Sequence, residues 1–189
     1  SGIDLELWII PLSICWLADR LHSLYKPGTT EKMLDMIFVL TDRRSLDRNI
    51  RDEFDNFAHL HQKEVVAYAK KAVNLKDFLS AQQSIVVSTQ QKFDWILKEI
   101  EGDPELKKLR VAFLIDEAHR SQYGFDAKLD PKTGEVRYGF AHHLRRALPN
   151  ATYVGFTGTP VELVNANTYG VFGNNIDVYD VTQAVEDAA

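Results

Sequence analysis

The fold is decided by the stretch VAFLIDEAH at residues 111–119. Its apolar run, 111–115, leads without interruption into the two carboxylates Asp116 and Glu117. A continuous apolar run of this length is typical of a strand that helices cover on both faces, as in a parallel sheet. We therefore predict a buried strand that ends at Asp116.

Short apolar runs alternate with amphipathic stretches along the rest of the chain, which predicts strand–helix units and an α/β fold with a mainly parallel central sheet. The predicted strands are 37–40, 64–68, 84–87, 111–115 and 152–156. The predicted helices are 12–24, a stretch around 46–57, 75–81, a stretch near 93–97, and 141–148. Residues 126–136 are polar and contain a turn signal, so we expect a surface excursion there.

Composition restricts the class of protein. The chain has 189 residues, 45% of them hydrophobic, which fits one soluble globular domain. The sequence contains no run of about 18 apolar residues, so we predict no membrane span. Acidic residues precede the apolar stretch at 8–10, which argues against a secretory signal and for the cytoplasm. The one cysteine, Cys15, excludes an internal disulfide, and we expect a small buried side chain there.

The charge balance limits how this protein could hold nucleic acid. Acidic residues outnumber basic ones by 27 to 22, for a formal net charge of −5. Proteins that coat nucleic acid through bulk charge are usually basic. Any contact with DNA must therefore be local, through a few groups that face phosphates.

Small polar or acidic residues stand at the ends of four predicted strands. They are Thr41 with Asp42, Ser88 with Thr89, Asp116 with Glu117, and the run Thr157, Gly158 and Thr159. Parallel sheets bind ligands at the carboxyl ends of their strands. If the sheet is parallel, these four strand ends share one edge and predict a site there.

Asp116 and Glu117 suit phosphate chemistry. An aspartate at a strand end can hold a hydrated Mg²⁺ together with phosphate oxygens. The neighbouring glutamate can then orient or deprotonate an attacking water. The competing interpretation is an acidic helix N-terminus, where carboxylates are favoured by the helix dipole.

Longer motifs resemble a known family. LIDEAHRSQYG at 114–124 resembles the DEAH box of superfamily 2 translocases. Its Arg-Ser-Gln continuation is most similar to the restriction (R, motor) subunit of type I restriction-modification enzymes. GFTGTP at 155–160 resembles motif III of that family, FVLTDR at 38–43 its motif Ia, and VVSTQQKF at 86–93 its next DNA-facing motif.

The resemblance implies a three-layer RecA-like domain of the P-loop NTPase type. It implies the first motor lobe of an ATP-dependent DNA translocase and endonuclease, with ATP and Mg²⁺ as cofactors. Double-stranded DNA and the modification and specificity subunits would be its partners. By their positions in the matching family motif, Asp116 would hold Mg²⁺ and Glu117 would position the attacking water. His119, Thr157, Gly158 and Thr159 would couple hydrolysis to movement, and Thr41, Arg43, Ser88 and Thr89 would lie near the DNA backbone.

The N-terminal segment departs from the family pattern. A P-loop needs Gly-Lys-Ser/Thr after its first glycine, and the alignment places Ile10 and Pro11 at the lysine and hydroxyl positions. Neither residue can replace them, because isoleucine has no charge and proline has neither a hydroxyl nor an amide hydrogen. We therefore divide the chain into an atypical segment at 1–11, the motor lobe at 12–165 and a connector at 166–189 toward a second lobe.

Two alternatives stay open at this point. The chain could be a catalytically dead pseudo-motor that acts as a binding or scaffold module, or part of another superfamily 2 helicase. We expect residues 1–189 alone not to hydrolyse ATP appreciably, since the P-loop lysine, the hydroxyl and a second lobe are missing.

Overall fold

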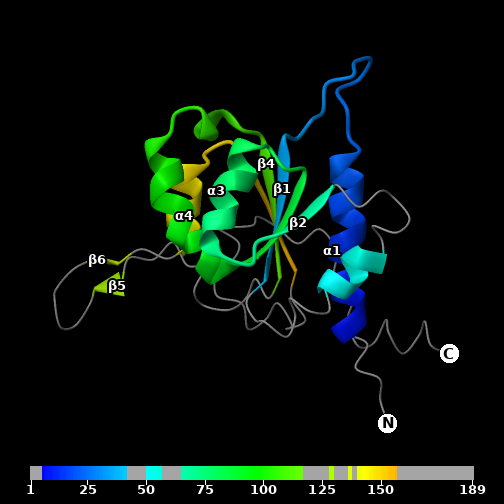
Figure 1. Cartoon of the computed structure of the whole chain (residues 1–189), viewed down its shortest axis with the longest axis horizontal. Coiled ribbons are helices and arrows are strands. Elements are labelled where there is room, and N and C mark those ends of the chain that lie inside the picture. The colour runs from blue at the N-terminus through cyan, green and yellow to red at the C-terminus, as the bar shows by residue number, and fades with distance from the viewer. Residues whose placement is uncertain are drawn as a thin grey trace, which may run out of the picture.

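The computed structural model of the chain describes residues 6–41, 50–56, 65–116, 128–129, 136–137 and 140–156. Its centre is a five-stranded, all-parallel sheet in the order β2-β3-β1-β4-β7 (Figure 1). The strands are β1 (Met36–Thr41), β2 (Val66–Tyr68), β3 (Ile85–Thr89), β4 (Val111–Ile115) and β7 (Thr152–Gly155). All five predicted strands are confirmed, with small shifts at their ends.

Helices cover both faces of this sheet. They are α1 (Glu6–His22), α3 (Ala72–Ser80), α4 (Gln90–Gly102) and α5 (Phe140–Ala147), with a 3-10 turn, η1, at Leu106–Lys108 and a helical segment at 50–56. Figure 1 shows α1 on one side of the sheet and α3 and α4 on the other. The three-layer α/β/α architecture is therefore confirmed.

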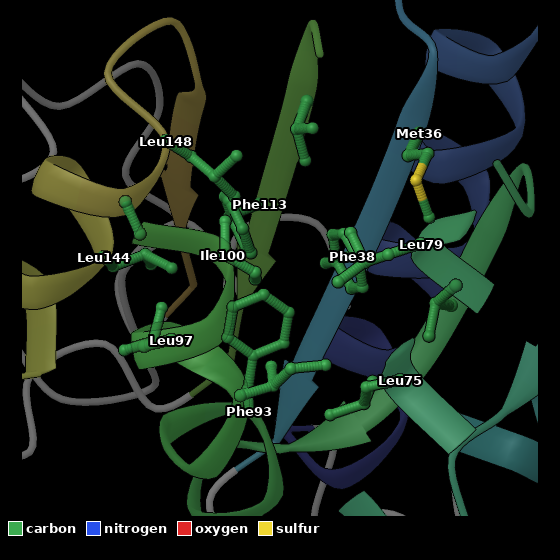
Figure 2. Close-up of a cluster of buried hydrophobic side chains, with 14 of the residues drawn as sticks. Met36, Phe38, Leu75, Leu79, Phe93, Leu97, Ile100, Phe113, Leu144 and Leu148 are labelled. Carbon is green, nitrogen blue, oxygen red and sulfur yellow. The ribbon is translucent and has the colours of Figure 1, made fainter. Parts of the chain in front are cut away.

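The alternation of side chains along each strand builds two cores. Met36, Phe38 and Leu40 point into the core under α3, α4 and α5, whereas Ile37 and Val39 point into the core under α1. Successive side chains of a strand face opposite sides, so an apolar run fills both cores at once. Figure 2 shows the first core, where Phe38 and Phe113 from the sheet meet Phe93 from α4.

Helix α1 corrects one prediction. The sequence pattern predicted a helix at 12–24, but α1 begins at Glu6, continues through Pro11 and ends at His22. Proline cannot donate an amide hydrogen and is disfavoured inside a helix, yet Pro11 is buried here, as are Ile14 and Ala18 one and two turns later. Packing against the sheet therefore overrides the local break. Gly28 adopts a positive φ of 72° in the turn that follows α1.

Three further predictions concern Cys15, the polar excursion and membrane-spanning helices. Cys15 is fully buried, as expected, and burial raises the pKa of its thiol well above the ordinary value, so the thiol stays protonated. The polar excursion contains a short antiparallel pair, β5 (Lys128–Leu129) with β6 (Val136–Arg137). Among the described helices, none is long and apolar enough to span a bilayer.

An ion-pair network ties the turn after α1 to the start of β4. The backbone amide and Nε of Arg110 donate to Oδ2 of Asp35 at 2.8 and 3.1 Å, and its Nη2 donates to Oδ1 at 2.7 Å. Glu31 joins through Nη1 of Arg110 at 2.8 Å and Nζ of Lys26 at 2.6 Å. Hydrogen bonds from Arg110 hold the pKa of the Asp35 carboxyl below its ordinary value.

We expect Asp35→Asn to lower the free energy of unfolding by about 1 kcal/mol, the size of a charge-assisted hydrogen bond at a partly exposed site. Because the pKa of Asp35 is lower in the folded state, its stabilisation is fully present above the unfolded pKa, about 3.9. It is lost as the pH falls through the folded value. Urea unfolding at several pH values measures both effects.

The control is Asp94→Asn, which changes an exposed aspartate on α4. The gap between wild type and Asp35→Asn should stay constant at neutral pH and shrink below about pH 4. A gap that keeps its size in acid would mean that the carboxylate charge contributes nothing.

Candidate functional site

Three of the four polar strand ends meet at the carboxyl edge of the sheet. Thr41 at the end of β1 is in register with Thr89 at the end of β3. The amide of Asp116 donates to the carbonyl of Leu40 at 2.9 Å, which places Asp116 beside Thr41. On its other side, the amide of Phe156 donates to Ile115 at 2.8 Å. The predicted convergence is confirmed for the strand ends that the structure describes.

These side chains are buried. Asp116 is 1% exposed and Thr41 is fully buried, as is Ser88, whose hydroxyl donates to the carbonyl of Thr89 at 3.1 Å. The hydroxyl of Thr41 has no hydrogen-bond partner among the described residues. Burying a polar group without a partner costs free energy, so an unsatisfied buried group is often found at a functional site. The edge beside Asp116 therefore has the polar character of a site.

Six predicted site residues lie outside the described residues, and the structure gives no account of them. They are Arg43, Glu117, His119, Thr157, Gly158 and Thr159. Within the predicted helix around 46–57, residues 50–56 are helical, and Ile50 and Phe54 are buried.

Among the described residues, only some of those needed to hold a metal ion and a nucleotide are present at this edge. Asp116 offers a carboxylate at a strand end, which suits a hydrated Mg²⁺. In Figure 1, α1 begins at the end of the molecule where the strands end, the usual place for phosphate-binding amides. However, Ile10 and Pro11 occupy the predicted lysine and hydroxyl positions inside this helix, and neither side chain carries such a group. Within the described ranges, no group of three or more His, Cys, Asp or Glu residues could hold a metal.

Sequence reasoning missed the residues at the β2 end of the same edge. Nζ of Lys92 in α4 donates to the carbonyl of Ala69 at 2.8 Å, and the exposed Lys70 and Lys71 follow directly. Nearby, the hydroxyl of Tyr68 donates to Asp55 at 2.9 Å. Burial, followed by Asp55, raises the pKa of Tyr68 above its ordinary value. The adjacent lysines after a predicted strand were the sequence signal.

The sheet, the covering helices and the buried aspartate at a strand end define a RecA-like α/β domain. The chain belongs to the SWI2/SNF2 ATPase family, whose profile matches residues 12–189. The resemblance that began with the motif around Asp116 is thereby confirmed at the level of the family.

The chain is also similar to curated type I restriction enzyme subunits. It is 37% identical over 155 residues to the HindI endonuclease subunit of Haemophilus influenzae, covering 81% of this chain and 14% of that protein. It is 28% identical over 150 residues to the putative MjaIXP endonuclease subunit of Methanocaldococcus jannaschii, covering 79% and 13%. A Staphylococcus aureus subunit, SauMSSORF170P, is 29% identical over 160 residues, covering 80% and 15%. The chain thus spans about one seventh of the length of these relatives.

Proposed function

We propose that this chain is the first RecA-like lobe of the motor in a type I restriction endonuclease subunit. The observation that carries the proposal is the buried Asp116 at the parallel edge, beside Thr41 and two strands from Thr89. Similarity to three restriction endonuclease subunits supports it. In this proposal residues 12–165 form the lobe, 1–11 an atypical leading segment and 166–189 a connector.

The proposed roles of Asp116 and Glu117 follow from residue chemistry, and the coupling roles follow from the family resemblance. Asp116 would hold Mg²⁺ with ATP, because this ion keeps most of its waters and takes one or two carboxylates. Glu117 would orient the attacking water, and His119, Thr157, Gly158 and Thr159 would link that chemistry to movement. The metal, when bound, would neutralise developing phosphate charge.

The DNA side of the proposal concerns the neighbouring strand ends. Thr41, Arg43, Ser88 and Thr89 would lie near the DNA backbone, and α4 begins directly after Thr89. Hydroxyls and helix N-termini suit phosphates without reading sequence. The partners in this proposal are double-stranded DNA and the modification and specificity subunits of a complex in the cytoplasm.

One observation favours a second candidate, a pseudo-motor that only binds or scaffolds. The continuous helix through Ile10 and Pro11 leaves no phosphate cradle in the described part of α1. A domain with this defect could retain the fold, and a fold alone does not establish activity.

Thermal unfolding with Mg²⁺-ATP separates the two candidates. A lobe that binds Mg²⁺-ATP is stabilised by mass action, by about 2.7 kcal/mol at a hundredfold excess over Kd. We expect a rise in Tm that depends on Mg²⁺ and is lost in Asp116→Asn. No rise at millimolar ATP would favour the pseudo-motor, and a rise that Asp116→Asn retains would remove Asp116 from the site.

A further inference from the structure

Three lysines gather at the carboxyl ends of β2 and β3. The amide of Ala69 donates to Val87 at 2.9 Å, so the chain leaves β2 level with the end of β3. Lys70 and Lys71 follow and are exposed. Lys92, the third residue of α4, places its ammonium 2.8 Å from the carbonyl of Ala69. Segments far apart in sequence thus bring three positive charges to one corner of the sheet.

Two helices begin at this corner. α3 starts after Lys71 and α4 starts after Thr89, and neither has an acidic residue in its first turn. Helix N-termini carry partial positive charge, which adds to that of the lysines. The segments 65–76 and 78–93 contain no aspartate or glutamate, although the whole chain has a net charge of −5. The positive charge here is local, as the composition requires of any contact with nucleic acid.

A buried, unsatisfied donor lies at the same place. Gln90, the first residue of α4, is 4% exposed, and its side-chain Nε2 has no hydrogen-bond partner among the described residues. A buried donor without an acceptor is costly. An oxygen-rich anion at the start of α4 is the kind of acceptor that this amide lacks.

The corner is too far from Asp116 to serve the same ligand. In the order β2-β3-β1-β4, three strand spacings separate β2 from β4. At about 4.8 Å per spacing this is roughly 14 Å. The lysines therefore face a second anion, separate from any ligand of Asp116. An extended anion that runs along the sheet edge fits several positive charges in a row better than a compact anion does.

We propose that Lys70, Lys71 and Lys92 bind consecutive phosphates of a duplex DNA backbone. The inference rests on the proposed function and adds Lys70 and Lys71, which lie outside the family motifs, to Lys92 within the motif at 86–93. Thr41 and Ser88 are fully buried, so the exposed lysines are the groups that DNA meets first at this corner. Lysine ammonium groups act as point charges and give affinity without sequence preference.

The test compares this chain with K70A/K71A in fluorescence anisotropy, using a labelled DNA duplex of random sequence over a series of salt concentrations. Each lost phosphate contact lowers the slope of log affinity against log salt by about 0.9. We expect the slope of the double variant to fall by about 1.8 and its affinity near 0.1 M salt to fall at least about tenfold. Both lysines are exposed, so the circular dichroism spectrum should not change.

The control for the loss of two positive charges is K107A/K108A, at an adjacent lysine pair before β4 in which Lys108 pairs with Glu105 at 2.7 Å. Loss of affinity and slope in K70A/K71A alone supports the inference. Wild-type binding that neither variant weakens, or that both weaken equally, overturns the inference and leaves the proposed function standing. A wild-type chain that does not bind duplex DNA overturns both the lysine contact and the DNA role.

Discussion

Replacing Phe113 by alanine is expected to lower the free energy of unfolding by about 3–5 kcal/mol, a large part of a domain's whole stability. Phe113 is fully buried in the middle of β4. Its ring stacks on Phe38 and Tyr153 at centroid distances of 5.3 and 5.4 Å and meets Phe93 edge-on at 5.3 Å. Truncation removes the centre of this aromatic cluster and leaves a cavity between β4 and α4.

The control is Trp95→Ala, which removes a larger aromatic side chain from the outer face of α4. Trp95 is 56% exposed, so its loss should change stability by no more than about 0.5 kcal/mol. Urea unfolding followed by circular dichroism measures both variants. Equal losses in the two variants would contradict the arrangement in which Phe113, and not Trp95, holds the layers together.

Replacing Asp116 by asparagine is expected to abolish ATP hydrolysis in the assembled restriction complex, under the proposed function. A carboxylate that positions a metal contributes several kcal/mol to stabilising the transition state. At about 1.4 kcal/mol per tenfold change, its loss lowers the rate of hydrolysis at least about a hundredfold. DNA-stimulated phosphate release measures the effect.

Thermal unfolding of the same variant separates catalysis from folding. Asn keeps the shape of Asp, and Asp116 is almost fully buried, so Tm without nucleotide shows whether the substitution disturbs the fold. Asp94→Asn on the outer face of α4 should retain wild-type hydrolysis. If Asp116→Asn hydrolyses ATP at the wild-type rate, the metal-binding role of Asp116 is wrong.

Much of the fold could be predicted because parallel strands that are buried on both faces need continuous apolar runs. The stretches around Val39, Val86 and Phe113 have this pattern, and each became a strand close to its predicted place. The start of α1 could not be predicted. Pro11 marks a helix boundary by local chemistry, and only its burial beside the sheet makes the helix continue through it.

The candidate site, like the fold, was predicted in part from the sequence and decided in part by the tertiary structure. By itself, the sequence determined which strand ends carry polar groups and, through the motif around Asp116, the family of the chain. Only the tertiary structure decided that Lys92 reaches the end of β2 and joins Lys70 and Lys71. Side chains 22 positions apart along the chain meet only when β2 and β3 pair in parallel register, because parallel strands are joined by a long crossover and their pairing is not a local feature of the chain.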